Sequence, residues 1–302
     1  MTRWLVTGAG GMLGQDLTAL LRASGADVAA LDRGHLDITD AAGTASAVAS
    51  VAPDFVVNCA AWTGVDDAEA HEQEALAVNG EGAANLAAAC AAAGARLVQP
   101  STDYVFSGTA SSPYAENDPT GPRTAYGRTK LAGEQAVLRL LPGAGYVLRT
   151  AWLYGAAGPN FIRTMIRLEA TRDTVAVVDD QHGQPTWTAD VARQILLLAQ
   201  ADAEPGIYHA TSTGQTTWFG LARAVFSLLG ADPGRVMPTS SAELARPAPR
   251  PAYSVLGHGA FDRAGLPMLP DWRDALERAF GEIAASEGRI RRGEPAESGR
   301  RP

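Results

Sequence analysis

A tyrosine and a lysine four residues apart, Tyr126 and Lys130, have residue types and a spacing that could move a proton onto a carbonyl oxygen. They lie in a segment of helical length, Ala125 to Leu141, that Pro142-Gly143 closes, and residues four apart share one face of a helix. Because a nearby ammonium favours the phenolate, we expect Lys130 to lower the pKa of Tyr126 toward working pH. The same spacing also arises by chance on solvated helix faces, so other residues must decide.

A glycine-rich turn, Gly8-Ala9-Gly10-Gly11-Met12-Leu13-Gly14, is the second chemical feature. The residues before it, Arg3 to Thr7, predict a buried strand, and apolar residues at helical spacing follow from Met12. The first glycine permits a backbone conformation that a side chain would forbid, Gly11 lets the main chain approach a pyrophosphate, and Gly14 lets the helix pack closely on the sheet. The turn therefore predicts a dinucleotide site at a helix N-terminus, although tight turns without a ligand have similar glycine clusters.

A second predicted strand, Asp27 to Leu31, precedes an acidic and a basic residue. Asp32 could bind the ribose hydroxyls of an adenosine, whereas Arg33 could pair with a 2′-phosphate, so these residues leave both NAD and NADP open. With either coenzyme, Lys130 could hold the nicotinamide ribose.

Two hydroxyl residues, Ser101 and Thr102, follow a predicted strand at Arg96 to Gln99. Doubly wound sheets bind ligands at the carboxyl ends of their strands. Either hydroxyl could therefore hydrogen-bond the carbonyl oxygen that Tyr126 protonates. Together with the glycine turn, these residues predict reduction of a carbonyl group by a nicotinamide coenzyme.

Strand-like runs alternate with segments of helical length, which predicts an α/β fold with a doubly wound parallel sheet of Rossmann-like type. The runs are Arg3–Thr7, Asp27–Leu31, Phe55–Val57, Arg96–Gln99, Tyr146–Leu148 and Thr174–Val178. We predict a dinucleotide-binding core with the catalytic helix at residues 1–150. A smaller C-terminal lobe at 151–283 is expected to bind mainly substrate and to interleave with the core. The polar composition of residues 284–302 predicts a disordered tail.

The composition, with 302 residues of which 46 % are hydrophobic and 19 % charged, is that of an ordinary soluble protein. A formal net charge of −8 without a basic stripe argues against nucleic-acid binding. Cys59 and Cys90 lie in apolar runs without metal-ligand spacing, so we expect inert buried thiols and no disulfide or zinc site. We find no signal peptide and no membrane span, which predicts a cytoplasmic protein.

Together these residues resemble the extended short-chain dehydrogenase/reductase superfamily, and within it the dTDP-4-dehydrorhamnose reductase family. The narrower resemblance runs from Arg3 to about Ile283. Its motifs are Asn58-Cys59-Ala60-Ala61-Trp62-Thr63 with Val65-Asp66, Ser101-Thr102-Asp103-Tyr104-Val105-Phe106, Arg149-Thr150-Ala151-Trp152-Leu153-Tyr154-Gly155, Asn160-Phe161, Gln184-Pro185-Thr186 and Arg250-Pro251. The resemblance implies reduction of the 4-keto group of dTDP-4-dehydro-L-rhamnose to dTDP-L-rhamnose, with NADPH, or alternatively NADH, as the cofactor.

The resemblance also implies residue roles. Thr102 would be the catalytic hydroxyl, Tyr126 the acid and Lys130 its modulator. The implied cofactor-binding residues are Gly8, Gly10, Gly11, Met12, Leu13, Gly14, Asp32, Arg33, Asp37, Ile38, Cys59, Ala60, Ala61, Tyr126 and Lys130. The implied substrate-binding residues are Thr63, Val65, Asp66, Thr102, Asp103, Tyr104, Tyr126, Trp152 and Arg250.

Three of these assignments have competing interpretations. Asp66 could bind sugar hydroxyls or stabilise the N-terminus of a helix predicted to begin at Ala68. Arg250 could contact the substrate diphosphate or be a plain surface charge. Trp152 could line the pocket or belong to the core.

The sequence departs from the family pattern at two places. Some relatives have a Glu after the glycine motif that joins a metal-bridged dimer, whereas this chain has Gln15, and it offers Ala189 beside Asp190 in the second region. We therefore expect no metal site and no Mg²⁺, and either a monomer or a homodimer. Near the C-terminus, Ser254-Val255-Leu256-Gly257 lacks the acidic or Asn residue common in the family.

Two other functions compete with this reduction. One is reduction of a related dTDP-4-keto-6-deoxyhexose for natural-product glycosylation, because both substrates share the nucleotide and the ketone. The other is a regulatory nucleotide-binding subunit without catalysis, against which the intact Thr102, Tyr126 and Lys130 argue.

Overall fold

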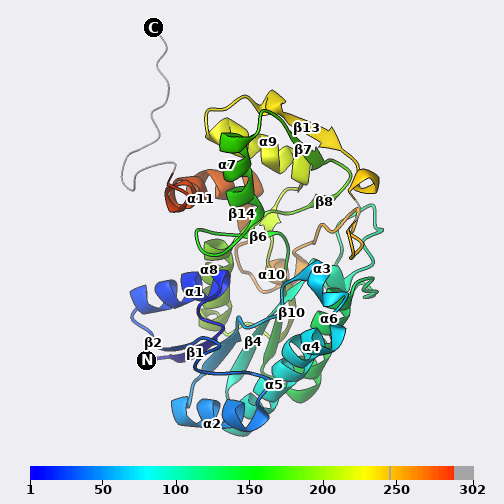
Figure 1. Cartoon of the computed structure of the whole chain (residues 1–302). Helices are drawn as coiled ribbons and strands as arrows, with labels where there is room; N and C mark the ends of the chain where they lie inside the picture. The colour runs from blue at the N-terminus through cyan, green and yellow to red at the C-terminus, as the bar shows by residue number, and fades with distance from the viewer. Residues whose placement is uncertain (245, 289–302) are drawn as a thin grey trace.

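The computed structural model describes residues 1–244 and 246–288, and its centre is a six-stranded sheet in the order β2-β1-β3-β4-β5-β10 (Figure 1). All neighbouring strands of this sheet are parallel. The strands are β1 (Arg3–Thr7), β2 (Asp27–Leu31), β3 (Phe55–Asn58), β4 (Arg96–Thr102), β5 (Gly145–Thr150) and β10 (Gly206–His209). The predicted doubly wound parallel sheet is confirmed.

Helices cover both faces of the sheet because successive side chains of each strand point to opposite faces. Trp4 and Val6 of β1 pack into the core beneath α1 (Met12–Ala23) and α8 (Thr188–Gln200). Leu5, between them, packs into the core of the other face. That face is covered by α2 (Ala41–Val51), α5 (Gly82–Ala93) and α6 (Ala125–Leu140).

The strand order reverses at β1, which pairs with β2 on one side and β3 on the other. A buried chain of hydrogen bonds ties the carboxyl ends of three strands here. The Thr7 hydroxyl donates to Asn58 Oδ1 at 2.7 Å, and Asn58 Nδ2 donates to Gln99 Oε1 at 2.8 Å. This edge is where a doubly wound sheet opens to bind a ligand.

A second body of structure lies above the carboxyl edge of the sheet in Figure 1 and has its own hydrophobic core. We call it the lobe. It contains α7 (Phe161–Thr171), β7 (Val175–Val178), α9 (Trp218–Leu228), β13 (Val236–Thr239) and α11 (Trp272–Ser286). β7 and β13 form a separate parallel pair, so the strand predicted at Thr174–Val178 exists but is not part of the central sheet.

Short elements connect these parts. The remaining strands are β6 (Leu153–Tyr154), β8 (His182–Gly183), β9 (Thr186–Trp187), β11 (Ser212–Thr213), β12 (Thr216–Thr217) and β14 (Leu269–Asp271). The remaining α-helices are α3 (Val65–Ala68), α4 (Glu72–Leu76) and α10 (Gly259–Arg263). A π-helical turn η1 (Ala77–Glu81) and the 3-10 turns η2 (Asp103–Val105), η3 (Pro233–Arg235) and η4 (Ser241–Glu243) complete the described chain.

Several predicted boundaries were wrong. β4 continues past Gln99 to Thr102 because β5 pairs with it throughout. The helix predicted to begin at Ala68 instead begins at Val65 and ends at Ala68. Asp66 therefore lies inside its first turn. Residues 284–288, which we predicted to belong to a disordered tail, include the end of α11, which buries Ala284 and continues to Ser286. Residues 289–302 lie outside the described residues.

The predicted division at residue 150 stays a proposal. Strand β10 and helix α8 follow it in sequence but pack with the central sheet, as an interleaved chain requires. Within residues 1–244 and 246–288, no helix is long and apolar enough to cross a membrane.

Candidate active site

The glycine turn between β1 and α1 requires glycine at two positions. Gly8 has φ +61°, and a Cβ placed there would lie 2.4 Å from the backbone N of Ala60. A Cβ at Gly14 would lie 2.4 Å from the carbonyl oxygen of Gly8. Gly11 is the N-cap of α1, and among the described residues no side chain caps this helix N-terminus by a hydrogen bond. The turn thus fits a bound pyrophosphate, which main-chain N–H groups and the helix dipole favour.

A cavity of about 500 Å³ opens beside this turn, and we call it the glycine cavity. It brings together most of the predicted cofactor residues, namely Gly8, Gly10, Gly11, Asp32, Arg33, Asp37, Ile38, Cys59, Ala60 and Ala61. Met12, Leu13, Gly14, Tyr126 and Lys130 are not among its lining residues. The lining also includes Gly34, Leu36, Trp62 and Val78, which we did not predict. Trp62 stands in a quoted motif, whereas Val78 has no local sequence signal.

The acidic residues of this cavity, Asp32 and Asp37, already accept hydrogen bonds from neighbouring residues of the chain. Asp32 Oδ1 accepts hydrogen bonds from the backbone N–H groups of Gly34 and His35 and from the His35 ring at 2.7 Å. The His35 hydrogen bond is the main cause that lowers the pKa of Asp32. Asp37 likewise accepts from the backbone and hydroxyl of Thr39. Arg33 is exposed beside them.

Neither cysteine has a reactive thiol. Cys90 is buried and Cys59 is partly buried. Burial raises the pKa of each thiol to about 12. Both thiols are therefore protonated and inert at neutral pH, as expected.

The predicted catalytic residues meet at the carboxyl edge of the sheet. Thr102 is the last residue of β4, and its hydroxyl accepts a 3.2 Å hydrogen bond from the backbone of Tyr104. Tyr126 and Lys130 lie on the first two turns of α6, which Thr124 caps. The Tyr126 hydroxyl interacts with the side chain of Thr102. The structure thus brings Tyr126 and Thr102 together although they come from different elements.

The pKa expectation for Tyr126 was wrong. Burial raises the pKa of Tyr126 to about 12, and the nearby Thr102 side chain only partly opposes this rise. Lys130 Nζ instead donates a 2.7 Å hydrogen bond to the carbonyl of Pro100, so its ammonium is directed at the strand. Burial lowers the pKa of Lys130 to about 8. The Tyr126 phenol is therefore protonated at neutral pH, as the acid of a reduction must be.

The choice between Ser101 and Thr102 is made by the alternation of β4. The Ser101 hydroxyl donates a 2.5 Å hydrogen bond to Glu134 Oε1. Glu134 also forms a buried ion pair with Arg149 at 2.8 Å, in which each side chain is 2 % exposed. Ser101 is therefore committed to this network, and Thr102 is the hydroxyl at Tyr126.

Asp103 is a buried carboxyl next to the catalytic hydroxyl. Its Oδ1 accepts a 3.0 Å hydrogen bond from Thr102, while Oδ2 has no hydrogen-bond partner among the described residues. Burial raises the pKa of Asp103 to about 6. The proximity of this carboxyl also raises the pKa of Tyr126, as a second effect after burial.

Trp152 is held in an unusual conformation where the chain passes from the sheet to the lobe. Its φ is +48°, which is costly for a bulky side chain. The indole stacks on Trp218 of α9, with ring centroids 3.6 Å apart and planes inclined by 7°. Phe161 packs on the Trp218 ring, with ring centroids 4.6 Å apart. Trp152 is thus partly buried and fixed by stacking on Trp218. Trp218 was not predicted.

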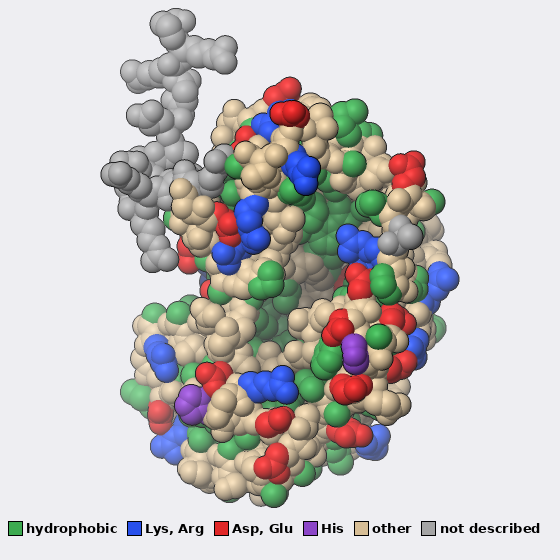
Figure 2. Space-filling view, in the orientation of Figure 1, with side chains coloured by type: hydrophobic (Ala, Val, Ile, Leu, Met, Phe, Trp, Pro, Cys, Tyr) green, Lys and Arg blue, Asp and Glu red, His purple; other side chains and the backbone are tan. Residues whose placement is uncertain are grey.

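A larger cavity of about 820 Å³ lies between α7, β7 and the segment 241–250, and we call it the lobe cavity. Figure 2 shows a hollow between the sheet and the lobe in which hydrophobic side chains gather. Three predicted substrate residues line the lobe cavity, namely Val65, Tyr104 and Arg250, together with Trp218, which was not predicted. Thr63 is exposed. The other predicted substrate residues are not among the lining residues: Thr63, Asp66, Thr102, Asp103, Tyr126 and Trp152.

Tyr126 lines neither cavity but is connected to one lining residue of each. Its ring meets that of Tyr104, which lines the lobe cavity, edge to face at 5.7 Å. It packs on the same small apolar cluster as Trp62, which lines the glycine cavity.

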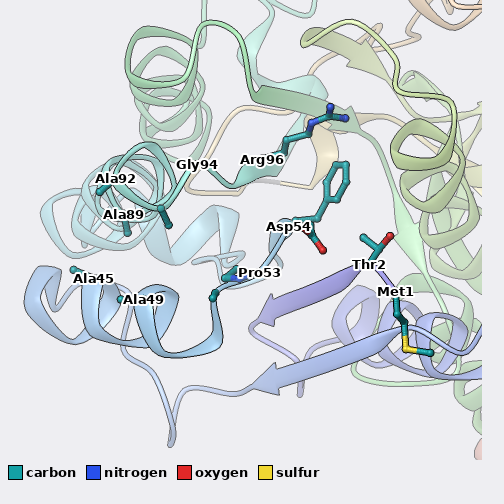
Figure 3. Close-up of a pocket in the computed structure, with 13 residues that line it drawn as sticks. Met1, Thr2, Ala45, Ala49, Pro53, Asp54, Ala89, Ala92, Gly94 and Arg96 are labelled. Atoms are coloured by element: carbon teal, nitrogen blue, oxygen red, sulfur yellow. The ribbon is translucent and has the colours of Figure 1, made fainter.

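A separate hollow of about 880 Å³ opens at the opposite edge of the sheet (Figure 3). Alanines of α2 and α5 form its walls, and Thr2, Asp54 and Arg96 lie at the amino ends of the strands. Arg96 begins the strand that Thr102 ends. This hollow is therefore a full strand length from the predicted catalytic residues and takes no part in their chemistry.

The position that carries Glu in some relatives is used differently here. Gln15 Nε2 donates a 2.7 Å hydrogen bond to the carbonyl of Gly10 in the glycine turn. Asp190 is buried and forms ion pairs with Arg193 and Arg278. In the part of the chain that the structure describes, no three His, Cys, Asp or Glu side chains gather as metal ligands.

Known proteins share this arrangement over nearly the whole chain. Residues 2–285 match the family model described as the RmlD substrate binding domain. A dTDP-4-dehydrorhamnose reductase of Streptomyces griseus is 61 % identical, over 95 % of this chain and 96 % of that protein. A dTDP-4-keto-6-deoxy-D-glucose reductase of Streptomyces niveus is 56 % identical, over 94 % and 99 %.

A solved structure extends this comparison to three dimensions. It is the crystal structure of dTDP-4-dehydrorhamnose reductase from Bacillus anthracis in complex with NADP. Its TM-score to this chain is 0.89 at 39 % identity, and the match covers 92 % of this chain and 98 % of that one. The resemblance read from the motifs is confirmed: the chain belongs to the RmlD substrate binding domain family, the family of the dTDP-4-dehydrorhamnose reductases.

Proposed function

We propose that the protein reduces the 4-keto group of dTDP-4-dehydro-L-rhamnose and releases dTDP-L-rhamnose, with NADPH as the coenzyme. The observation that carries this proposal is the position of Tyr126 near the Thr102 side chain at the carboxyl edge of the sheet, in ring contact with Tyr104 of the lobe cavity. The Streptomyces griseus relative, named for this reaction, supports the choice of substrate.

The chain's own residues account for the proton. The raised pKa keeps Tyr126 protonated, so its hydroxyl can donate to the carbonyl oxygen as negative charge develops there. Thr102, whose single hydroxyl proton is donated to Asp103 Oδ1 in this structure, would turn that proton to the same carbonyl oxygen as a second hydrogen bond. NADPH, when bound, supplies the hydride to the carbonyl carbon. The Lys130 ammonium, anchored on Pro100, stabilises the phenolate that remains and is placed to hold the nicotinamide ribose.

The residues of the glycine cavity are proposed to bind the coenzyme. The turn from Gly8 to Gly14 would hold the pyrophosphate, as its backbone geometry requires. Arg33 is proposed to bind the 2′-phosphate of NADPH, because Asp32 already accepts hydrogen bonds from its own turn. The NADP complex of the Bacillus anthracis relative supports this coenzyme.

The substrate is proposed to enter from the lobe cavity. Tyr104, whose ring contacts Tyr126, and Val65 line that cavity, and Arg250 is proposed to supply positive charge for the diphosphate. Trp152, with its fixed indole, is proposed as a wall for the sugar. Roles for Thr63 and Asp103 stay predictions, as do cytoplasmic residence and assembly as a monomer or homodimer.

The direct test is oxidation of NADPH and NADH by the purified protein, supplied with enzymatically generated dTDP-4-dehydro-L-rhamnose, with identification of the sugar product. We expect fast oxidation of NADPH and formation of dTDP-L-rhamnose. Tight coenzyme binding without oxidation would contradict the proposal.

A second candidate is reduction of a related dTDP-4-keto-6-deoxyhexose. It is favoured by the Streptomyces niveus relative, which is 56 % identical and named dTDP-4-keto-6-deoxy-D-glucose reductase. Turnover of that keto sugar at a higher kcat/KM than the rhamnose precursor would select it. Failure to turn over any keto sugar, with a stoichiometric enzyme partner recovered, would select a regulatory subunit.

A further inference from the structure

One carboxylate of α3 holds two groups of the lobe segment 246–250. Asp66 Oδ2 accepts a 2.7 Å hydrogen bond from Arg250 Nη2. Asp66 Oδ1 accepts a 3.2 Å hydrogen bond from the backbone N–H of Ala248. Asp66 and Arg250 are 184 residues apart in sequence, so this carboxylate joins the two parts of the molecule.

Arg250 is held from two directions. Its Nη1 donates a 2.9 Å hydrogen bond to the carbonyl of Ala248, while Nη2 is bound to Asp66. Its side chain is only 14 % exposed. Arg250 lines both the lobe cavity and a neighbouring cavity of about 340 Å³. A guanidinium has more N–H donors than these two contacts use, so it can bind an anion without leaving Asp66.

The charges along the lobe cavity are of one sign. Among its described lining residues, Arg246 and Arg250 carry positive charge and no carboxylate is present. Arg246 lies 3.7 Å from Asp66 but is 55 % exposed, so it is the more mobile of the two cations. Tyr104 stays neutral, because burial raises the pKa of its hydroxyl. Arg250 is thus the cation of this cavity that hydrogen bonds fix in place.

We propose that Asp66 is a positioning residue that fixes the Arg250 guanidinium for the substrate diphosphate, and that it is not a ligand of the sugar. This inference rests on the proposed function of the same site. Both Asp66 oxygens already accept hydrogen bonds from the segment 246–250, and Asp66 is not among the residues that line the lobe cavity, whereas Arg250 is. A guanidinium fixed in advance loses less conformational freedom when the anion binds.

The test is calorimetric binding of dTDP, which contains the diphosphate but no sugar at its end. Arg250→Ala and Asp66→Ala are both expected to weaken dTDP binding by roughly tenfold or more, the size of a lost charge-assisted contact. The double variant is expected to bind no more weakly than Arg250→Ala, because Asp66 acts only through Arg250. Asp66→Asn, which keeps an acceptor for Ala248, is expected to lose nearly as much as Asp66→Ala.

Asp67→Asn is the matched control. Asp67 is the next residue of α3, and its contact is with His71 at 3.1 Å. We expect this variant to bind dTDP as the wild type does. Hydrogen exchange supplies a readout without ligand: the Ala248 amide should exchange faster in Asp66→Ala and remain protected in Asp67→Asn.

Two results would overturn the proposal. Loss of affinity for a dTDP-sugar with unchanged affinity for dTDP would make Asp66 a sugar ligand. Tighter dTDP binding by Asp66→Asn would mean that Asp66 masks Arg250 instead of positioning it. If the wild type binds dTDP but oxidises no NADPH with any keto sugar, the proposed function fails while this inference is still tested by dTDP.

Discussion

The Ser101 hydroxyl donates a 2.5 Å hydrogen bond to Glu134, which lies on α6 about two turns beyond Tyr126. Ser101 pairs in register with Arg149 of the next strand, and Arg149 closes the network with two bonds to the same carboxylate. The helix that carries Tyr126 is thereby attached to both strands at the site. Thr102, one residue after Ser101, is placed by this attachment.

The first prediction concerns the acid. Tyr126→Phe removes the hydroxyl but keeps the ring that packs against Tyr104. We expect turnover to fall about 10²–10⁴-fold, because a positioned proton donor contributes on that order. NADPH affinity should change little, which fluorescence titration would show. Tyr253→Phe, which removes an exposed hydroxyl, is the control and should keep its turnover. Near-normal turnover by Tyr126→Phe would rule out the acid role.

The second prediction concerns the buried ion pair. Glu134→Ala leaves the Arg149 guanidinium buried without its carboxylate, and we expect the free energy of unfolding to fall by about 3–5 kcal/mol. Glu72→Ala breaks a pair of similar geometry with Arg128, but that pair is 39 % and 43 % exposed. There we expect a loss of about 0–1 kcal/mol. Denaturant unfolding measures both, and equal losses would contradict the role of burial.

The third prediction is a pH dependence of stability. Burial raises the pKa of Asp103 to about 6, whereas an unperturbed Asp has a pKa of about 4. Between these two pH values the folded state binds more protons than the unfolded state, so stability should fall as the pH rises from about 4 to about 6. Asp103→Asn cannot ionise, and we expect it to exceed wild type by roughly 2–3 kcal/mol at about pH 8 and by almost nothing near pH 4. Unfolding curves at both pH values decide, since a constant difference would exclude ionisation as the cause.

The fourth prediction concerns the coenzyme. Arg33→Ala removes the exposed cation of the glycine cavity, and Asp32 next to it keeps its turn with His35. We expect KM for NADPH to rise roughly tenfold, because a charge-assisted contact with the 2′-phosphate is lost. KM for NADH should stay unchanged and serves as the control within the same variant. A parallel rise for both coenzymes would assign Arg33 to the shared part of the molecule.

Features that depend on neighbouring residues were readable from the sequence. The glycine turn was predicted correctly because its demands are local: Gly8 needs a positive φ and Gly14 needs space next to the turn. Five of the six strands of the central sheet were predicted because apolar runs are local patterns too. The sixth strand, β10 (Gly206–His209), was not predicted. The family followed from motifs, each of which is a short run of consecutive residues.

Other features depend on residues that meet only after folding. The choice of Thr102 over Ser101 was decided by Glu134, and the bond between Asp66 and Arg250 joins residues 184 apart. The pKa of Tyr126 was mispredicted because spacing shows that Lys130 is near, but it does not show burial or the direction of the ammonium. Residue types and local spacing thus named this chemistry, whereas solvent exclusion and long-range contacts, which exist only in the packed molecule, decided protonation states and partners.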